Sequence, residues 1–582
     1  MPLVEVRNLS FSYPGAMVPA IDSLSFSVKA GEYLAVVGAN GSGKSTLLRC
    51  LNGLLKPPAG AISVGGFDPS QPEHRLELRR RLSLVFQSPP DQIVASVAEE
   101  DVAFGPENLG LPKAEMDRRV EDALRVTGLL AERKRPPRFL SAGQQQRLAV
   151  AGALAMDPEC IVFDEATAMI DPSGRAELLD LIDSLVASGK AVIHITHDME
   201  EASRAQRVLA LASGSLRYDG DPQGLFSRAD LAELGLEYPE SMRIALALGL
   251  DPRPGESPGD LARRILALMP AQESSTVNVS ALPAESVAGA AGSVASEDAT
   301  EPAYQAADLG FSYLAGSGDE RRALDGLSME IRPGSSVALV GTTGSGKSTL
   351  LQIISALAQA GSGSTRTLGI DPSEPKVDLR SLRMRAPLSV QRPESAIFEP
   401  YVGDEVAFGP RNQGMRGAGL VSRVREALDM VELPYEEYRD RQTRILSGGQ
   451  KRRVAIASVL AMSPELLVMD EPGSALDPAS RRKLMDTLFL SVRGLHTLAF
   501  STHSMEEAAR ADYVAVLSGG CLKAFGPPSE VFGKEWDPSW GLLRPYAAEL
   551  AAELERAGIG LPGGILDGEG MAAGLRPRGS AA

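Results

Sequence analysis

Short apolar runs that end at a glycine or a carboxylate recur along the chain, and they predict buried strands. The runs "YLAVV" at residues 33–37 and "SVALV" at 336–340 each lead into a glycine-rich loop. The runs "CIVFD" at 160–164 and "LLVMD" at 466–470 each end in a carboxylate. Continuous apolar runs are typical of strands covered on both faces of a parallel sheet. The N-terminal stretch "VEVRNLSFSY" instead alternates, as a strand does.

The whole pattern occurs twice, which predicts two copies of one domain. "LSFSYPG" near Tyr13 returns as "LGFSYLAG" near Tyr313, and "VVGANGSGKSTLL" returns as "LVGTTGSGKSTLL". "FLSAGQQQRLAVAGALAMDPECIVFDEA" likewise returns as "ILSGGQKRRVAIASVLAMSPELLVMDEP". Matches this long and this evenly spaced are not chance motifs.

Composition indicates where the segment between the two copies lies. Residues 271–300 are rich in Ala, Ser, Val and Glu and contain no aromatic residue, which is typical of a flexible tether; a short packed helix is the alternative. We predict a first domain with a small C-terminal extension, a flexible linker, a second domain, and a helical extension with a disordered tail, at residues 1–245, 246–302, 303–535 and 536–582.

Composition narrows the class of protein. The 582 residues are 43% hydrophobic and 23% charged, with a net charge of −16. That acidic balance argues against nucleic acid as the main partner. The three cysteines are isolated in the sequence, so neither a disulfide framework nor a zinc site is indicated. No apolar run is long enough to cross a bilayer, and the N-terminus lacks a signal-peptide core. If the protein acts at a membrane, other chains must provide the span.

Two glycine-rich loops carry the phosphate chemistry. Residues 38–45 and 341–348 both fit G-x-x-x-x-G-K-[ST], and each loop follows an apolar strand and opens a helix. The glycines allow backbone amides to wrap around phosphate, and the helix N-terminus favours negative charge. Lys44 and Lys347 are expected to reach the β- and γ-phosphates of a nucleotide, and Ser45 and Ser348 to hold Mg²⁺.

Paired carboxylates follow the strands "CIVFD" and "LLVMD". Asp164 and Asp470 stand at the strand ends, where they are placed to bind Mg²⁺ through water. Glu165 and Glu471 come next and are the candidates to polarise the water that attacks the γ-phosphate. An isolated Asp-Glu pair would more simply be a solvated turn, but these pairs lie downstream of phosphate loops.

Two histidines occupy equivalent positions after apolar strands. "VIHITHD" gives His197 and "LAFSTHS" gives His503. We interpret both as contacts to the γ-phosphate, whereas His194 is expected to be a packed strand residue.

"LSAGQ" at 140–144 and "LSGGQ" at 446–450 resemble the signature of ABC-type ATPases, and the resemblance covers most of both copies. It implies an α/β fold: two tandem ABC nucleotide-binding domains, each with a RecA-like parallel sheet core, an antiparallel β subdomain and a helical subdomain. It also implies an intramolecular dimer that sandwiches two ATP molecules head to tail, with Lys44 opposite Ser447 and Lys347 opposite Ser141.

The nucleotide contacts that this resemblance implies come from the phosphate loops, the signatures, the adenine-stacking tyrosines and the two Q-loop glutamines. They are Tyr13, Gly38, Ala39, Asn40, Gly41, Ser42, Gly43, Lys44, Ser45, Thr46, Gln87, Ser141, Gly143 and Gln144, and then Tyr313, Gly341, Thr342, Thr343, Gly344, Ser345, Gly346, Lys347, Ser348, Thr349, Gln391, Ser447, Gly449 and Gln450. Gln87 and Gln391 would also contact Mg²⁺, together with Ser45, Asp164, Ser348 and Asp470.

The two copies depart unequally from the family pattern. Copy one has Ala142 where the signature usually has glycine, and it reads "DEATAMID" where "DEPTSGLD" is commoner. The extra methyl group would crowd the approach of the backbone to the γ-phosphate. We therefore hypothesise that the site containing Lys347 and Ser141 is the slower one.

One further repeated segment points to a transport role. "DVAFGPENLG" at 101–110 and "EVAFGPRNQG" at 405–414 lie downstream of Gln87 and Gln391. Gly-Pro suggests a simple surface turn. Yet the segment closely resembles the ATPases of energy-coupling factor (ECF) transporters, which take up vitamins or transition-metal ions. That resemblance implies a helical-subdomain surface that contacts an integral membrane subunit, a separate substrate-binding membrane protein, and a peripheral location on the cytoplasmic face of the membrane.

Three other functions remain possible from the sequence. A fused importer ATPase of another class, such as those for simple sugars, commonly has a degenerate second phosphate loop, but residues 341–348 are intact. A soluble translation factor with tandem ABC domains would carry a long charged helical linker. An ATPase of DNA repair or chromosome organisation would need zinc modules or long coiled coils, and neither is visible.

Overall fold

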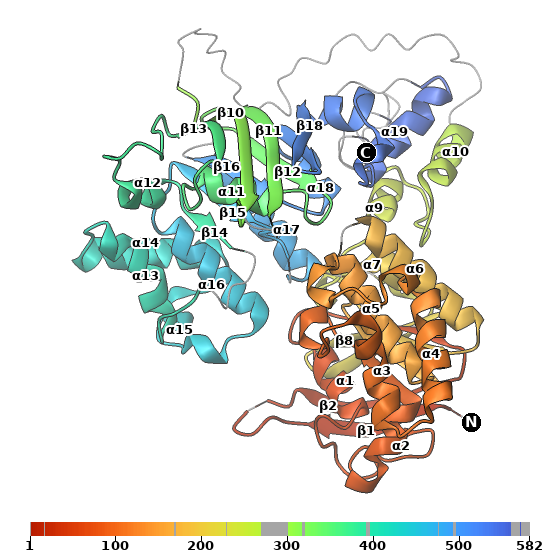
Figure 1. Cartoon of the computed structure of the whole chain (residues 1–582). Coiled ribbons are helices and arrows are strands. Elements are labelled where there is room, and N and C mark those ends of the chain that lie inside the picture. The colour runs from red at the N-terminus through yellow and green to blue at the C-terminus, as the bar shows by residue number, and fades with distance from the viewer. Residues whose placement is uncertain are drawn as a thin grey trace. The chain divides into compact units, whose positions relative to one another are not determined.

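Each repeat forms a six-stranded sheet, a three-stranded sheet and a group of helices (Figure 1). The computed structural model describes residues 2–16, 18–167, 170, 172–228, 230–268, 301–316, 320–390, 396–474, 476–492, 496–559, 571 and 575. Two compact units emerge. The first is Met1–Pro239, Pro252–Gly255 and Ala475–Arg481; the second is Glu240–Asp251, Glu256–Ser474 and Arg482–Ala582.

The large sheet of the first unit has the strand order β5-β6-β7-β3-β8-β9. Its first five strands run parallel, and β9 pairs antiparallel with β8. Every residue of the central strands β3 and β7 is buried, which confirms the prediction of parallel strands covered on both faces. The strands are β3 Tyr33–Val37, β5 Leu82–Val85, β6 Cys160–Asp164, β7 Ala191–Ile195, β8 Arg207–Ala212 and β9 Ser215–Gly220.

The small sheet of the first unit is antiparallel and contains the alternating N-terminal strand. Strand β1 (Val4–Phe11) lies between β2 (Ile21–Val28) and β4 (Ile62–Val64). Its apolar residues Val4, Val6 and Leu9 are buried in one core with residues of the large sheet. Burial of one face explains the alternation in the sequence.

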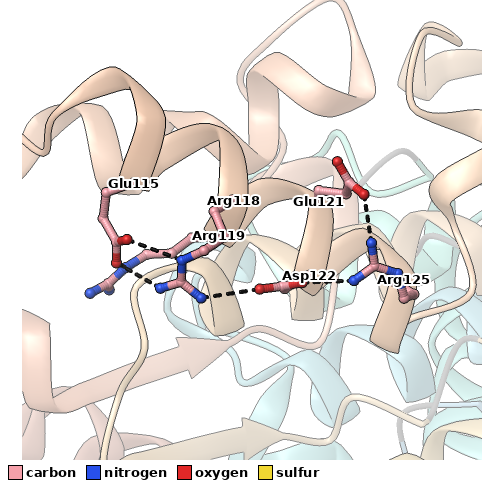
Figure 2. Close-up of polar contacts among 6 residues, drawn as sticks. All are labelled: Glu115, Arg118, Arg119, Glu121, Asp122 and Arg125. Atoms are coloured by element: carbon pink, nitrogen blue, oxygen red, sulfur yellow. Dashed lines mark hydrogen bonds and ion pairs between the residues drawn. The ribbon is translucent and has the colours of Figure 1, made fainter.

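Three helices form a separate helical group in the first unit: α3 (Ala98–Asn108), α4 (Lys113–Val126) and α5 (Ala142–Ala155). They share an apolar core that includes Val102, Leu124 and Leu148. The exposed face of α4 is covered by a ladder of ion pairs (Figure 2). Arg118 donates to Glu115 at 2.8 Å and to Asp122 at 3.2 Å, and hydrogen bonds from Arg118 and Arg119 lower the pKa of Glu115 to about 2. Charged pairs at this spacing mark the face as solvated.

The second unit repeats this architecture. Its large sheet has the order β14-β15-β16-β12-β17-β18, and its small antiparallel sheet has the order β11-β10-β13. The parallel core, the antiparallel β part and the helical group of the predicted α/β fold are thus all present in each repeat. The strands are β10 Tyr304–Tyr313, β11 Arg321–Ile331, β12 Ser336–Gly341, β13 Ser362–Thr367, β14 Leu388–Ser389, β15 Leu466–Asp470, β16 Thr497–Ser501, β17 Tyr513–Ser518 and β18 Cys521–Gly526.

Further helices belong to the sheet-covering layers of both units and to the helical group of the second unit. They are α1 Lys44–Leu51, α2 Arg75–Arg81, α6 Pro172–Ala187, α7 Met199–Ser203 and α8 Pro222–Phe226, and then α11 Lys347–Ile354, α12 Leu379–Arg385, α13 Val402–Asn412, α14 Gly417–Met430, α15 Tyr435–Tyr438, α16 Gly448–Leu460, α17 Pro478–Val492 and α18 Met505–Ala509. In the part of the chain that the structure describes, no helix is both long and apolar enough to span a membrane.

Part of the predicted linker 246–302 is helical rather than flexible. Helices α9 (Glu240–Ala247), α10 (Pro258–Leu268) and α19 (Tyr546–Arg556) share one apolar cluster within the second unit. Leu261 and Ile265 lie on one face of α10 and are buried in this cluster, and Ser257 caps the helix by accepting from the Asp260 amide. This apolar face is the reason that α10 packs instead of forming a tether. Residues 269–300 of the predicted linker lie outside the described residues.

The predicted disordered tail also needs a partial correction. Met571 and Leu575 are described; Met571 is fully buried in the α9–α10–α19 cluster, and Leu575 packs against it. The apolar side chains of Met571 and Leu575 therefore attach this part of the tail to the cluster, although the surrounding sequence predicts a loop. The other residues beyond Ile559 lie outside the described part of the chain.

The repeated "AFGP" segments are helical, so their interpretation as simple surface turns is wrong. Both lie inside α3 and α13, each of which contains a proline near its C-terminal end. A Cβ on Gly105 would lie 2.5 Å from Sδ of Met156, and one on Gly409 would lie 2.4 Å from Cγ of Met462. The glycines thus permit close packing of helices rather than a change of chain direction.

Candidate functional site

The two phosphate loops adopt a backbone that needs glycine at two places each. In the first loop, Gly38 and Gly43 have φ values of 149° and 103°. A Cβ on Gly38 would lie 2.2 Å from the carbonyl oxygen of Leu211, and one on Gly43 would lie 2.5 Å from that of Ala20. Gly341 and Gly346 show the same crowding in the second loop. Only glycine therefore allows each loop to adopt this backbone and to pack this closely against neighbouring carbonyl groups.

The loop lysines are buried and held over the loops. Nζ of Lys44 donates to the carbonyl oxygens of Gly38 and Ala39 at 2.7 and 3.0 Å. Nζ of Lys347 makes the equivalent bonds to Gly341 and Thr342 at 2.7 and 3.1 Å. Each ammonium group thus lies beside the backbone of its loop, from where it can move a short distance to an anion bound by that loop.

Burial lowers the pKa of Lys44, while Glu165, Asp164 and Asp477 act to raise it. These carboxylates favour the charged form of the lysine.

Two serine hydroxyls inside the loops are suited to an anion. Oγ of Ser42 and Oγ of Ser345 are buried and have no hydrogen-bond partner among the described residues. Unpaired buried hydroxyl groups are costly unless a ligand completes them. Together with the lysines and the glycine cradle, they fit a phosphate group. Ala39, Asn40 and Gly41 of the first loop, and Thr343 and Gly344 of the second, lie in the same strand-to-helix connections. Ser45 and Thr46 lie in the first turn of α1, and Ser348 and Thr349 lie in the first turn of α11.

The structure brings Glu165 together with Gln87 and His197. Oε2 of Glu165 accepts from Nε2 of Gln87 at 3.0 Å, and Oε1 lies 3.5 Å from Nδ1 of His197. Burial opposes ionisation of Glu165, but the hydrogen bond and the charge of His197 outweigh it and lower the pKa of the carboxyl. Burial likewise opposes a charge on His197, but Glu165 raises its pKa. The arrangement holds Glu165 as a carboxylate.

The second repeat has the same pair at closer range. Oε1 of Glu471 lies 3.0 Å from Nε2 of His503. Glu471 and Glu165 both adopt left-handed backbone conformations, with φ of 50° and 47°, which costs energy for a residue with a Cβ. Gln391, the predicted partner on this side, lies outside the described residues.

The strand-end aspartates differ between the repeats. Burial and the charge of Glu165 raise the pKa of Asp164 to about 6, against the opposing charges of Arg49 and Lys44. Asp470 instead accepts a hydrogen bond from the hydroxyl of Ser501. A half-buried carboxylate with a raised pKa is suited to a cation. Among the described residues no three His, Cys, Asp or Glu side chains gather into a metal site.

The signature segments form helix N-termini. Ser141 caps α5: its hydroxyl accepts from the amide of Gln144 at 3.2 Å, and the Gln144 side chain accepts from the Ser141 amide at 3.0 Å. Ser447 and Gln450 form the same capping box on α16. The predicted residues Gly143 and Gly449 lie in these first turns. Such termini present free amides to an anion.

The candidate adenine-stacking tyrosines have partly open rings. Tyr13 and Tyr313 are 37% and 42% exposed. Their hydroxyl groups lie 3.2 Å from Oγ1 of Thr46 and 3.0 Å from Oγ1 of Thr349. Each tyrosine is therefore fixed beside its phosphate loop with ring surface available for stacking.

A network that sequence reasoning missed supports His197. His194 is fully buried in β7, as predicted for a strand residue, and its Nδ1 lies 3.0 Å from the hydroxyl of Tyr33. The buried Glu201 accepts from Thr196 at 2.6 Å and pairs with Arg175 at 2.7 Å. These groups fix the segment from residue 194 to 201. Only the spacing of polar residues after the strand could have indicated it.

The acidic residue that opens each "VAFGP" segment anchors a loop. Oδ1 of Asp101 accepts from the amides of Val94 and Ala95 at 2.7 and 2.9 Å. Oε2 of Glu405 accepts from the amides of Phe398 and Glu399 at 3.1 and 2.8 Å. Both carboxylates are buried. Each therefore fixes the segment that follows the Q-loop to a helix of the helical group.

The anchored loops, together with helices α3 and α13, present apolar side chains at the surface. Val94 and Phe104 are 64% and 52% exposed, and we call them the Phe104 patch. Phe398, Tyr401 and Phe408 are also exposed, and we call them the Phe408 patch. The rings of Phe398 and Phe408 pack edge to face at 4.6 Å. Exposed apolar side chains at matching positions of two repeats indicate an interaction surface.

Comparison with known proteins matches both repeats. The ABC transporter family model matches residues 21–168 and 324–474. An ABC transporter ATP-binding protein of Bifidobacterium longum is 35% identical over 89% of this chain, which spans 66% of that protein, or just under two thirds. One from Methanosarcina acetivorans is 34% identical over 96% of this chain and 92% of its own length. The energy-coupling factor transporter ATP-binding protein EcfA1 of Enterococcus faecalis is 46% identical over 42% of this chain and 89% of its own length.

Proposed function

This chain belongs to the ABC transporter family and is an ATP-hydrolysing ABC ATPase with two nucleotide-binding domains, and we propose that it energises an ECF-type importer for a vitamin or a transition-metal ion. The observation that carries this proposal is the pair of anchored apolar patches, which recur at equivalent positions of both helical groups. The likeness of part of the chain to an energy-coupling factor ATPase supports it.

We assign the phosphate-loop residues to ATP and the strand-end aspartates to Mg²⁺. The orphaned hydroxyl groups of Ser42 and Ser345 and the glycine cradles fit the phosphates. Mg²⁺ typically takes one or two protein ligands plus phosphate oxygens. Ser45 and Asp164 in one site, and Ser348 and Asp470 in the other, would supply those ligands, with Gln87 and Gln391 beside them. The ion would neutralise charge that develops on the phosphates during hydrolysis.

In each site the glutamate after the strand is the proposed base. Glu165 and Glu471 would accept the proton of the attacking water, because each is held as the partner of a histidine that orients it. His197 and His503 would contact the γ-phosphate, and Lys44 and Lys347 would withdraw from their loop carbonyls to bind the β- and γ-phosphates. Tyr13 and Tyr313 would stack on adenine.

We further propose that the two ATP molecules are sandwiched head to tail, with Lys44 opposite Ser447 and Lys347 opposite Ser141. The capping boxes of Ser141 and Ser447 support this pairing, because each signature presents the amides of a helix N-terminus to an anion. The shared cluster of α9, α10 and α19 would keep the extensions of both repeats together while the nucleotide sites open and close.

The Phe104 patch and the Phe408 patch would dock an integral membrane subunit, next to a separate membrane protein that binds the substrate. The chain would then act as a peripheral protein on the cytoplasmic face of the membrane. Closure around ATP would move the helical groups, and the anchored loops would pass that motion to the docked helices.

Affinity purification of the tagged chain from detergent-solubilised membranes, followed by mass spectrometry, tests this function. Recovery of a multi-span membrane protein with a small integral binding protein is the expected result, and the latter identifies the cargo. Recovery of ribosomal proteins without membrane partners would contradict the importer and favour a translation factor.

A further inference from the structure

A buried arginine lies directly behind the second catalytic glutamate. Arg452 is on α16 and is 2% exposed. Among the described residues, its guanidinium group donates hydrogen bonds to four backbone carbonyls and one hydroxyl. They are those of Val390 at 3.3 Å, Asp470 at 3.1 Å, Pro472 at 3.4 Å and Glu471, and Oγ of Ser474 at 3.1 Å.

These acceptors come from segments that all meet the reaction site. Val390 immediately precedes the Q-loop glutamine, Asp470 and Glu471 end β15, and Ser474 lies in the loop that follows. None of the five acceptors is a carboxylate, so the buried charge is stabilised here by carbonyl dipoles. A planar guanidinium with five donors can satisfy such a spread of acceptors, whereas an ammonium group cannot.

The first repeat has a glutamine at this position. Gln146 is also buried, and its Nε2 donates to the carbonyl oxygen of Phe86 at 3.2 Å, the counterpart of the Val390 contact. Its Oε1 has no hydrogen-bond partner within the described residues. In sequence, Ala168 stands where the second repeat has Ser474. The first repeat thus lacks both the charge and the hydroxyl acceptor of this contact set.

We propose that Arg452 is a positioning residue for Glu471: it ties the strained backbone of the glutamate to the signature helix α16. The inference rests on the proposed role of Glu471 as the base. Movement of α16, which begins at the capping residue Ser447, is then transmitted to Glu471, while Glu165 in the first repeat has no such connection to α5 through Gln146. The two catalytic glutamates respond unequally to motion of their own helical groups.

The test is Arg452→Gln, which installs the residue of the first repeat. It is made in the full-length Glu165→Gln protein, where turnover depends on Glu471. Misplacement of a reacting group by about 1 Å costs roughly 100-fold in rate, so we expect kcat to fall about 10- to 100-fold. The KM for ATP should stay within about twofold, because Arg452 does not touch the phosphate loop. Arg452→Lys should not restore kcat.

A matched control is Arg453→Gln on the same helix, whose guanidinium lies 3.9 Å from Glu432; it should leave kcat within about twofold. In the Glu471→Gln background, where turnover depends on Glu165, Arg452→Gln should also leave the residual rate within about twofold. An equal loss of kcat in both backgrounds would mean that Arg452 has only a structural role, and it would overturn the inference. An unchanged kcat in both backgrounds would also overturn it.

The proposed role of Glu471 is tested separately. If Glu471→Gln alone leaves turnover unchanged, then Glu471 is not the base. That result would contradict the proposed function and not the positioning role of Arg452. If Arg452→Gln does not fold, Ser474→Ala removes one acceptor of the guanidinium and should lower kcat about fivefold at unchanged KM in the Glu165→Gln background, as loss of about one hydrogen bond implies. Unchanged kcat in that variant would overturn the inference.

Discussion

The carboxylate of Glu405, on α13, accepts a hydrogen bond from the backbone amide of Phe398 at 3.1 Å. The same contact in the first repeat joins Asp101 to Val94 at 2.7 Å. In both repeats a buried acid in the first turn of a helix fixes a loop that carries an exposed apolar side chain. The loop therefore moves with the helix, and this is what the proposed coupling to a membrane subunit needs.

Removal of this anchor should weaken the association with membrane subunits without stopping ATP hydrolysis. Asp101→Ala loses two hydrogen bonds to a charged group, each of which contributes about 1.5–3 kcal/mol. We expect recovery of membrane subunits in affinity purification to fall severalfold, while the kcat of the purified chain changes by less than about twofold. Glu100→Ala, at an exposed neighbouring position, is the control. Full recovery of partners with Asp101→Ala would contradict the role of the anchor.

The Glu405 anchor predicts a pH-dependent stability. Burial raises the pKa of Glu405 above its ordinary value of 4.5, although the amides of Glu399 and Phe398 act against this. A carboxyl with a raised pKa in the folded state destabilises the fold progressively as pH rises above 4.5. Glu405→Gln keeps an acceptor oxygen but cannot ionise. Its melting temperature relative to the wild type should therefore increase from pH 4.5 upward and then level off.

Thermal melting of both proteins across that range checks this prediction. Asp429→Asn, which removes a charge from an exposed position of α14, is the control and should retain the pH slope of the wild type. A constant difference between Glu405→Gln and the wild type at all pH values would refute the prediction.

The close packing at Gly105 predicts unequal effects for two glycine substitutions in one helical group. Gly105→Ala would place a Cβ 2.5 Å from Sδ of Met156, so that side chain must move, and overpacking of up to about 1–3 kcal/mol offsets the gain in helix propensity; the variant should be less stable than Gly152→Ala. Gly152→Ala, on α5, meets no atom within 4 Å and should stabilise the helix by roughly 0.5–1 kcal/mol. Denaturant unfolding of both variants measures the difference. Equal stability of the two variants would contradict the described packing.

The departure of the first signature from the family pattern predicts unequal sites. Glu165→Gln leaves turnover to the site with Lys347 and Ser141, and Glu471→Gln leaves it to the site with Lys44 and Ser447. We expect the Glu165→Gln protein to be the slower one, because Ala142 adds a methyl group to the signature of the remaining site. Equal residual ATP turnover of the two variants would contradict this hypothesis.

The structure narrows where the effect of Ala142 can come from. At Gly448, the equivalent glycine of the second repeat, an added Cβ would meet no atom within 4 Å. A methyl group at Gly448 would thus be tolerated by its own domain, and the proposed crowding by Ala142 concerns the approach of the nucleotide.

Local patterns predicted much of the fold. Apolar runs such as residues 33–37 became central strands because both faces of the sheet are covered, and the alternation around Val4 became a half-exposed strand. The candidate site could be predicted from the sequence for a related reason. The glycines of the loops are required by backbone geometry that leaves a fixed spacing in the sequence.

Tertiary contacts could not be predicted in the same way. Helix α10 lies in the segment that composition predicts as linker, because its few apolar residues acquire meaning only when they pack against α9 and against α19, which is distant in sequence. Gly105-Pro106 indicated a turn because the packing of Met156 leaves no local signal. Arg452 likewise reads as one of several basic residues after the signature until its acceptors are brought together.

The most direct test of the account is quantitative affinity purification of a variant with both patches made charged, Phe104→Glu with Phe408→Glu, from detergent-solubilised membranes. The same preparation is assayed for ATP turnover. We expect turnover to stay within about twofold of the wild type while the multi-span membrane subunit and its small binding partner are lost. Undiminished recovery of those membrane proteins by the variant would contradict the claim that the two patches couple this ATPase to a transporter.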